Sequence, residues 1–218
     1  MDKKFDLGAM PQGDPEEMAR WADMVVDLAW AETTPPEVLE DIVAFLERVE
    51  LDDFDTSECK YLPHLVLSGL LENQAVPAAV LRRLFVYLAS LKHCWPEGEL
   101  AQLAFHRNTP PGVLEQIADD FVSKVEPGSS DCLIGEGLIY NPNVPPDLLI
   151  KLAGFGNCDL MRAMTDQKRT PIDLLVQHLE CPAEYCQERL RNGLLGRPDT
   201  PEHVKAFLAL SGVGDETF

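Results

Sequence analysis

The sequence has few basic residues and no long apolar run. Its 218 residues include 18 lysines and arginines against 37 aspartates and glutamates, so the net charge is −19. Such a charge repels nucleic-acid phosphate and favours basic partners. No apolar stretch approaches the ~20 residues of a membrane-spanning helix, and residues 1–6 lack the apolar core of a secretory signal. We therefore expect a soluble, cytoplasmic protein that contacts neither membranes nor nucleic-acid phosphate directly.

The cysteines lack the close spacing of metal centres. None forms a C-x-x-C pair; they stand at Cys59, Cys94, Cys132, Cys158, Cys181 and Cys186. Structural zinc uses closely spaced ligand pairs, and iron–sulfur clusters use tight cysteine runs. The nearest approach to a ligand group is His178 with three of these cysteines, Cys158, Cys181 and Cys186. We expect reduced thiols, no metal and no cofactor.

Signatures of catalysis are also missing from the sequence. It contains no glycine-rich phosphate loop, serine-nucleophile elbow or zinc-protease motif. The neighbours His93 and Cys94 could suggest an activated thiolate, but adjacent residues on a helix point in different directions. We assign no catalytic residues and predict that the protein is not an enzyme.

What the chain does contain is a helix start with proline, repeated six times. The aligned stretches are Thr34-Pro35-Pro36-Glu37-Val38-Leu39, Val76-Pro77-Ala78-Ala79-Val80-Leu81, Thr109-Pro110-Pro111-Gly112-Val113-Leu114, Val144-Pro145-Pro146-Asp147-Leu148-Leu149, Thr170-Pro171-Ile172-Asp173-Leu174-Leu175 and Thr200-Pro201-Glu202-His203-Val204-Lys205. Proline is tolerated in the first turn of a helix because its missing N–H has no intrahelical partner there. Four starts carry threonine, which we expect at the N-cap, and Thr34 with Glu37 fits a capping box.

Each proline start follows another run with helical periodicity, and no run alternates with period two. The expected helix pairs are 15–31 with 35–49, 58–73 with 77–92, 96–107 with 110–124, 131–141 with 145–155, 157–167 with 171–180 and 182–193 with 201–211. A single pair cannot bury both apolar faces, whereas stacked neighbours can. We therefore predict an all-α, right-handed α-α superhelix, an α-solenoid of about six helical pairs.

This interpretation makes residues 15–211 one repeat domain, with a flexible lead-in at 1–14 and a disordered tail at 212–218. Leu114 and Leu149 occupy equivalent positions in two repeats, so we expect both in the core. Trp21 and Trp30 fall in an amphipathic run and are interpreted as packing anchors rather than as a binding cage.

The stretches Asn108–Ala118 and Asn141–Ala153 resemble units of the leucine-rich repeat variant family, in which an Asn/Thr-Pro-Pro turn precedes a Leu-Leu…Leu-Ala helix. The resemblance implies stacked units in a helical solenoid and says little about activity. The spacing here is longer and less regular than in that family, nearer HEAT-like geometry. Some members bind an iron–sulfur cluster through closely spaced cysteines, which this sequence lacks, so no cofactor is carried over.

The negative charge is concentrated near the N-terminus. Residues 1–60 hold 17 acids and 5 bases, a balance of −12. The densest acidic cluster consists of Glu50, Asp52, Asp53, Asp55 and Glu58. Counted from Asp53, an EF-hand would need glycine at the sixth position and glutamate at the twelfth, and neither is present. The cluster is interpreted either as a solvated turn between repeats or as a patch that steers a basic partner.

These features predict a non-catalytic helical-repeat scaffold that binds another protein or peptide, most readily a basic one. The site residues expected for this partner are the acidic cluster, Glu50, Asp52, Asp53, Asp55 and Glu58. One alternative is an acidic inhibitor or immunity-type protein, or a mimic of nucleic acid. Another is a metal- or thiol-dependent enzyme that uses the scattered histidines and cysteines.

Overall fold

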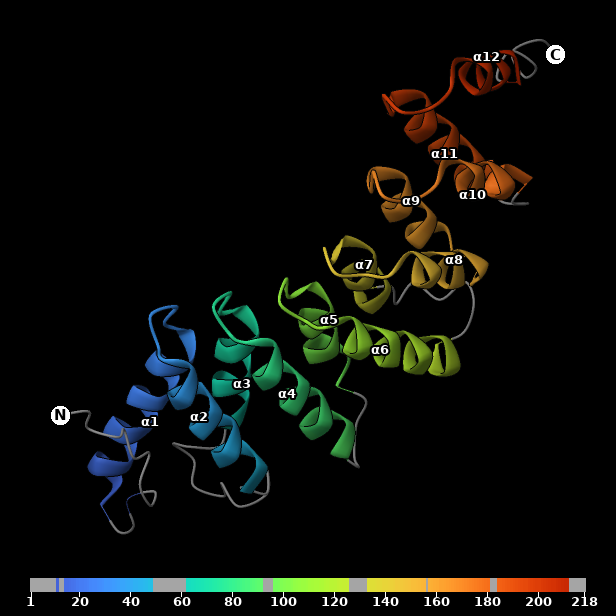
Figure 1. Ribbon diagram of the computed structural model, residues 1–218. Helices are drawn as coiled ribbons and strands as arrows, with labels where there is room; N and C mark the ends of the chain where they lie inside the picture. Colours follow the sequence, from blue (N-terminus) through green and yellow to red (C-terminus); the bar gives the residue numbers. More distant parts are fainter. Residues whose placement is uncertain are drawn as a thin grey trace. The chain divides into compact units, whose positions relative to one another are not determined.

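The structure, a computed structural model, describes residues 11, 14–48, 62–91, 96–125, 133–155, 157–180 and 184–211. Within these ranges every regular element is a helix, which confirms the all-α prediction there (Figure 1). The elements are α1 (Pro15–Trp30), α2 (Pro36–Arg48), α3 (Leu62–Glu72), α4 (Ala78–Ser90), α5 (Glu97–Phe105), α6 (Pro111–Lys124), α7 (Leu133–Tyr140), α8 (Pro146–Gly154), α9 (Cys158–Asp166), α10 (Ile172–Gln177), a 3-10 turn (His178–Glu180), α11 (Glu184–Gly196) and α12 (Glu202–Ser211). No helix in these ranges is both long and apolar enough to cross a membrane.

The helices fall close to the ranges expected from the sequence. For example, the expected 35–49 and 110–124 correspond to Pro36–Arg48 and Pro111–Lys124. At ends that lie within the described residues, the largest differences are near the C-terminus, where α10 ends at Gln177 and α11 continues to Gly196. Most of the expected lead-in at 1–14, and the tail at 212–218, lie outside the described residues.

The chain divides into two compact units, Met1–Leu114 and Glu115–Phe218, with the boundary inside α6. We call the helix before each proline turn a first helix and the helix after it a second helix. In unit 1 the first helices contact one another in series, α1 with α3 and α3 with α5, and the second helix α2 contacts α4. In unit 2 the first helices α7, α9 and α11 contact in the same serial order. Figure 1 shows this layering within each unit.

All six proline starts share one backbone turn of six residues. The N–H of the first turn residue makes the last backbone hydrogen bond to the first helix. This residue is Ala31, Asn73, His106, Asn141, Gln167 or Arg197. The carbonyl of this residue accepts the N–H of the residue three positions later, over 2.9–3.4 Å. That fourth residue is Thr34, Val76, Thr109, Val144, Thr170 or Thr200, and it is buried in every copy. The repeat read from the prolines is therefore a repeat of backbone conformation.

The threonines of these turns do not act as expected. Each second helix begins later than the capping interpretation requires; in α10, for example, Pro171 rather than Thr170 is the N-cap residue and makes no side-chain cap. The hydroxyl of Thr34 instead donates to the carbonyl of Leu28 over 2.7 Å, at the end of the preceding helix. Thr109 donates in the same way to Leu103 over 2.6 Å. The proline at the fifth turn position takes the N-cap place, and the hydroxyls of Thr34 and Thr109 bond back to the preceding helix.

Side chains of the turns also bind the backbone of the preceding turn in the same unit. In unit 1 the His106 ring lies 2.9 Å from the Asn73 carbonyl, and Asn108 donates to two carbonyls of the preceding turn. In unit 2 Arg169 donates to the carbonyls of Pro142 and Asn141, and the buried Arg197 donates to those of Gln167 and Lys168. These bonds satisfy carbonyls that the turn leaves without helical partners. They hold successive turns of each unit in register.

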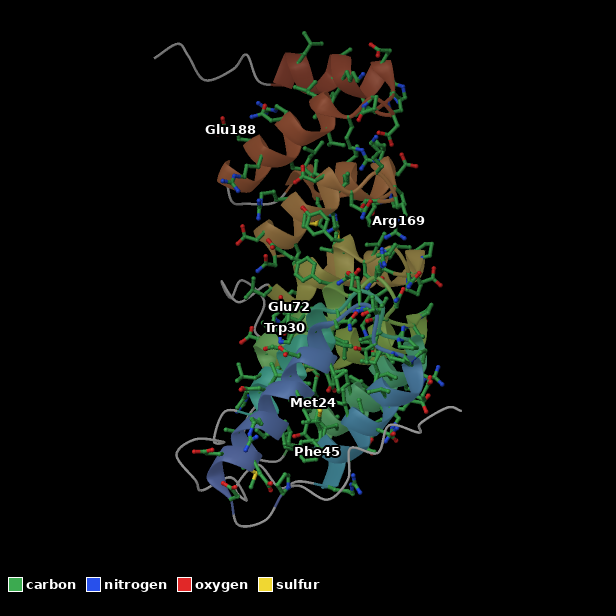
Figure 2. All side chains as sticks on the ribbon, turned by 90° about the vertical axis from the view of Figure 1, so that its left-hand side faces the viewer. Met24, Trp30, Phe45, Glu72, Arg169 and Glu188 are labelled. Carbon is green, nitrogen blue, oxygen red and sulfur yellow. The ribbon has the colours of Figure 1, made fainter. Side chains whose placement is uncertain are left out.

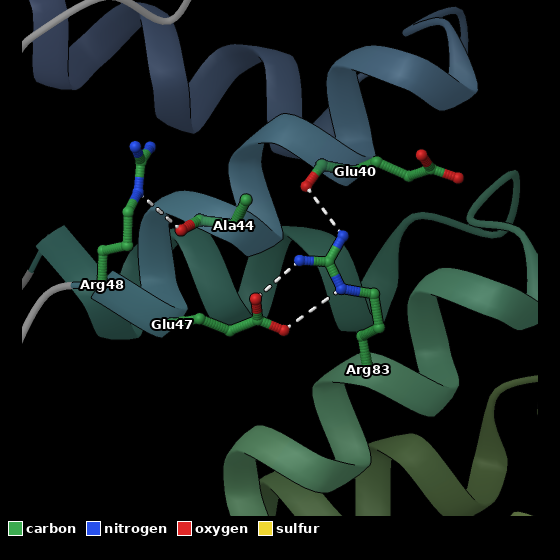
Figure 3. A network of polar contacts seen from close by, with 5 residues as sticks. All are labelled: Glu40, Ala44, Glu47, Arg48 and Arg83. Carbon is green, nitrogen blue, oxygen red and sulfur yellow. Dashed lines mark hydrogen bonds and ion pairs between the residues drawn. The ribbon is translucent and has the colours of Figure 1, made fainter.

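The second helices of unit 1 are joined by a bidentate ion pair (Figure 3). The Arg83 guanidinium on α4 donates to both carboxylate oxygens of Glu47 on α2, over 3.1 and 2.6 Å, and to the Glu40 carbonyl over 3.4 Å. Both side chains remain more than a third exposed, at 38% each. Solvent screening limits the contribution of such a pair to about 0–1 kcal/mol. The packed leucines therefore contribute more to holding α2 against α4.

The core lies between the layers of first and second helices. Leu114 and Leu149 are buried, with 0% and 1% of their surface exposed, which confirms their expected burial. Three glycines allow first helices to approach closely: a Cβ at Gly69, Gly135 or Gly193 would collide with a side chain of the adjacent first helix.

Candidate functional site

The acidic cluster at Glu50, Asp52, Asp53, Asp55 and Glu58 lies outside the described residues. Its interpretation as a steering patch therefore stays a prediction based on sequence and charge.

The proposed ligand group around His178 is only partly described. Both ring nitrogens of His178 lie 3.0 Å from carbonyl oxygens, Nδ1 from that of Leu174 and Nε2 from that of Ala153. These contacts leave neither nitrogen turned toward an open ligand position. Within the ranges that the structure describes, no group of three or more His, Cys, Asp or Glu side chains could hold a metal ion.

The exposed large apolar side chains of unit 1 gather on its first helices. Four of the five in the described part of this unit belong to α1, α3 and α5, and Val86 on α4 is the fifth. The four are Met24, Trp30, Leu65 and Phe105. Trp30, Leu65 and Phe105 keep 43%, 51% and 45% of their surface exposed. Exposed apolar side chains that cluster on one layer are typical of an interaction surface.

The same helices carry most of the acidic excess of unit 1. In α1, α3 and α5 seven acids stand against one base, Arg20. The acids are Glu16, Glu17, Asp23, Asp27, Glu72, Glu97 and Glu99. In α2 and α4 four acids stand against three arginines. We call the exposed surface formed by Asp27, Trp30, Leu65, Glu72 and Phe105 the first-helix face.

A buried asparagine holds the ends of α1 and α3 together. The Nδ2 atom of Asn73 lies 3.0 Å from the carbonyl oxygens of both Ala29 and Ala31. These two residues flank Trp30, and Asn73 directly follows Glu72. The last residues of the two first helices, Trp30 and Glu72, therefore lie side by side, as Figure 2 shows.

Neighbouring residues fix the two side chains further. A Cβ at Gly69 would lie 2.6 Å from Cδ1 and 2.8 Å from Nε1 of Trp30, so the indole packs against the glycine backbone. Glu72 follows Gly69 by three residues and shares its helix face. From α5, the Gln102 side-chain amide lies 3.5 Å from Oε1 of Glu72, and Phe105 follows one turn later. Trp30, Glu72 and Phe105 thus occupy the equivalent last position of three successive first helices.

Unit 2 repeats the pairing of an aromatic ring with an acid at equivalent positions. Tyr140 ends α7, and its hydroxyl lies 3.4 Å from Oδ2 of Asp166, which ends α9. The Gln167 amide donates to the Ile139 carbonyl over 3.1 Å, as Asn73 does to Ala29 in unit 1. Burial raises the pKa of the Tyr140 hydroxyl, and the charge of Asp166 raises it further. The Tyr140 hydroxyl therefore remains protonated and can donate to the carboxylate.

This arrangement can attract a cation. The face of an aromatic ring carries negative potential, and a carboxylate beside it adds a full negative charge.

The sequence contained a signal for these residues, because each one directly precedes a proline turn: Trp30, Glu72, Phe105, Tyr140 and Asp166. Alignment on the prolines alone did not extend back to this position. Trp30 does pack as an anchor, as expected, yet it also keeps an exposed surface.

Comparison of the chain with protein families, with characterised proteins and with solved structures found no match.

Proposed function

We propose that this protein is a non-catalytic helical-repeat scaffold, a right-handed α-α superhelix of six helical pairs related to the leucine-rich repeat variant or HEAT-like type, that binds a basic protein. The first-helix face carries this proposal, because it combines exposed apolar side chains with a seven-to-one excess of acids over bases on its helices. Burial of the apolar side chains would contribute affinity, and the acids would raise the association rate and the specificity for a basic partner.

The six repeated turns support the scaffold part of the proposal. Each turn is bonded internally in the same way, and the bonds between successive turns within each unit keep neighbouring first helices aligned. Equivalent positions of successive repeats then form one extended surface, which is how helical solenoids bind their partners. The described residues of α1, α3 and α5 form such a row in unit 1.

The proposed function is tested by isolating the partner. The chain is immobilised and exposed to an extract of its native source, and each retained protein is purified and bound again. The proposal expects a basic protein that binds directly and loses affinity steeply as salt rises. A partner with an acidic surface, or one whose binding does not depend on salt, contradicts it. Competition by duplex DNA for the same partner would instead identify a nucleic-acid mimic.

A further inference from the structure

We infer that the Trp30–Glu72 pair is a binding subsite for an arginine side chain, presented by a partner segment that places leucine-like side chains against Leu65 and Phe105. This inference rests on the proposed function, since it names the surface and the chemistry that would recognise the basic partner. It goes further in assigning a binding role to Trp30, which the sequence predicts to be a packing anchor.

The geometry suits a planar cation. The Trp30 ring packs on Gly69 but keeps 43% of its surface exposed. Two hydrogen bonds from Asn73 to the residues that flank Trp30 hold the backbone of Glu72 beside this residue, and the Glu72 side chain is exposed. Guanidinium stacks on indole and pairs bidentately with carboxylate, so arginine can use both groups at once. Because the two helix ends are already held together, their backbone loses little conformational entropy on binding.

The charge balance favours an occupant from another protein. A second copy carries a net charge of −19 and is repelled by an acidic face. The longer segments outside the described residues do not complement it either: residues 1–10 hold two acids and two bases, and residues 49–61 hold five acids and one base. A basic segment of another protein is the occupant that fits.

The probe is a synthetic peptide of repeated Arg-Leu-Leu with a fluorescent label. Its control replaces each arginine by citrulline, which has the same shape without the charge. Binding is followed by fluorescence anisotropy in low and in physiological salt. The protein variants are Glu72→Gln, which removes the charge, and Trp30→Leu, which keeps apolar packing but removes the aromatic face. Matched controls are Glu37→Gln and Val86→Ala on the second helices of the same unit, both exposed.

The arginine peptide should bind the native protein at least about tenfold more tightly than the citrulline peptide. Trp30→Leu should weaken binding about tenfold, and Glu72→Gln about three- to tenfold, with smaller losses at high salt. Each control variant should stay within about twofold of the native protein, since neither residue belongs to the first-helix face. Circular dichroism of each variant shows whether the helical fold is retained.

Equal binding of the two peptides by the native protein would overturn the inference, as would equal losses in the control and face variants. If the arginine peptide binds the native protein and both variants, Trp30→Leu and Glu72→Gln, with the same affinity, the assigned subsite is wrong. The proposed function, binding of a basic protein, is not contradicted by that result. If instead the isolated native partner proves acidic, the proposed function fails whatever the peptides do. The two experiments therefore fail in distinguishable ways.

Discussion

The Nε2 atom of His106 lies 2.9 Å from the carbonyl oxygen of Asn73, in the preceding turn of unit 1. The other ring nitrogen, Nδ1, accepts the backbone N–H of Asn108 over 3.2 Å. An acceptor at Nδ1 and a carbonyl at Nε2 place the single proton of a neutral ring on Nε2. Protonation of the buried ring would break the bond from Asn108. The bond from Asn108, within the His106 turn itself, therefore requires a neutral histidine, whereas the bond to Asn73 does not.

This requirement predicts that unit 1 loses stability in mild acid. Burial, followed by the nearby Arg107 charge, lowers the pKa of His106, although its bond to Asn73 opposes the shift. The unfolded chain therefore takes up a proton below the ordinary histidine pKa of about 6.5, while the folded chain does not. Stability should be complete above this value and fall as the pH decreases below it, down to the lowered pKa of the folded state.

The measurement is the free energy of urea unfolding of the native protein and of His106→Gln at several pH values between about 7.5 and 5. Glutamine can still donate to the Asn73 carbonyl but does not titrate. The variant should therefore show a shallower loss of stability in acid. The other histidines are present in both proteins and cancel in the comparison. Parallel pH profiles would show that His106 does not cause the loss.

A second prediction concerns the buried threonines of the turns. The Thr109 hydroxyl donates to the Leu103 carbonyl over 2.6 Å, so Thr109→Val should cost about 1–2 kcal/mol of unfolding free energy. Among the residues that the structure describes, the buried Thr170 hydroxyl has no hydrogen-bond partner. Thr170→Val should therefore be neutral or stabilising, by up to about 1–2 kcal/mol.

The chain itself suggests that valine fits this position. Val76 and Val144 occupy it in two of the six turns and are buried there, at 0% and 4% exposure. Valine has nearly the shape of threonine, so each substitution changes the hydroxyl and little else. Chemical unfolding of both variants decides the matter. Equal losses at Thr109 and Thr170 would mean that the hydroxyl bond does not distinguish them.

The positions of the helices could be predicted because their causes are local in sequence. Prolines restrict where a second helix can begin, and the paired leucines after them mark its buried face. Such signals predicted α2 and α6 to within one residue at each end. The extension of α11 to Gly196 was missed because two glycines in its last turns, Gly193 and Gly196, favour an earlier end in sequence. Close packing of Gly193 against Thr165 accounts for one of them.

The candidate site was less predictable because its causes are not local. Asn73, His106, Gln167 and Arg197 share one turn position and bind the preceding turn or the end of the helix before it, yet they have no common residue type. Nothing in a single sequence marks them as equivalent until the turns are superposed. The exposure of Trp30 likewise depends on how α3 approaches α1 through Gly69. The amphipathic run of α1 alone favours a packing role.

A third prediction contrasts two neighbouring residues of α8. Leu149 is 1% exposed and Ile150 is 53% exposed. Leu149→Ala should cost about 2–5 kcal/mol, because it removes buried methyl groups and leaves a cavity. Ile150→Ala should change stability by no more than about 0.5 kcal/mol. Leu114, with 0% exposure, should behave like Leu149. The free energy of unfolding in denaturant measures both losses. Equal losses for Ile150→Ala and Leu149→Ala would contradict the buried position of Leu149 in the repeat.

The last prediction returns to the acidic cluster near the end of the first repeat. Asp52, Asp53 and Asp55 lie within four residues of sequence, in a 60-residue stretch that holds 17 acids and 5 bases. Their fields add over about one Debye length, ~8 Å at physiological salt. They should accelerate the approach of a basic partner without contacting it in the final complex. Charge at the edge of an interface affects the association rate more than the dissociation rate.

The triple change of these three aspartates to lysine should therefore slow association with the isolated basic partner, by about tenfold or more at low salt, and flatten its dependence on salt. The dissociation rate should change little, whereas Trp30→Leu should raise it, because the indole belongs to the contact itself. Stopped-flow or surface-based kinetics separates the two rates. An association rate that the triple variant leaves unchanged at low salt would assign these acids to solvation of the chain and remove them from partner binding.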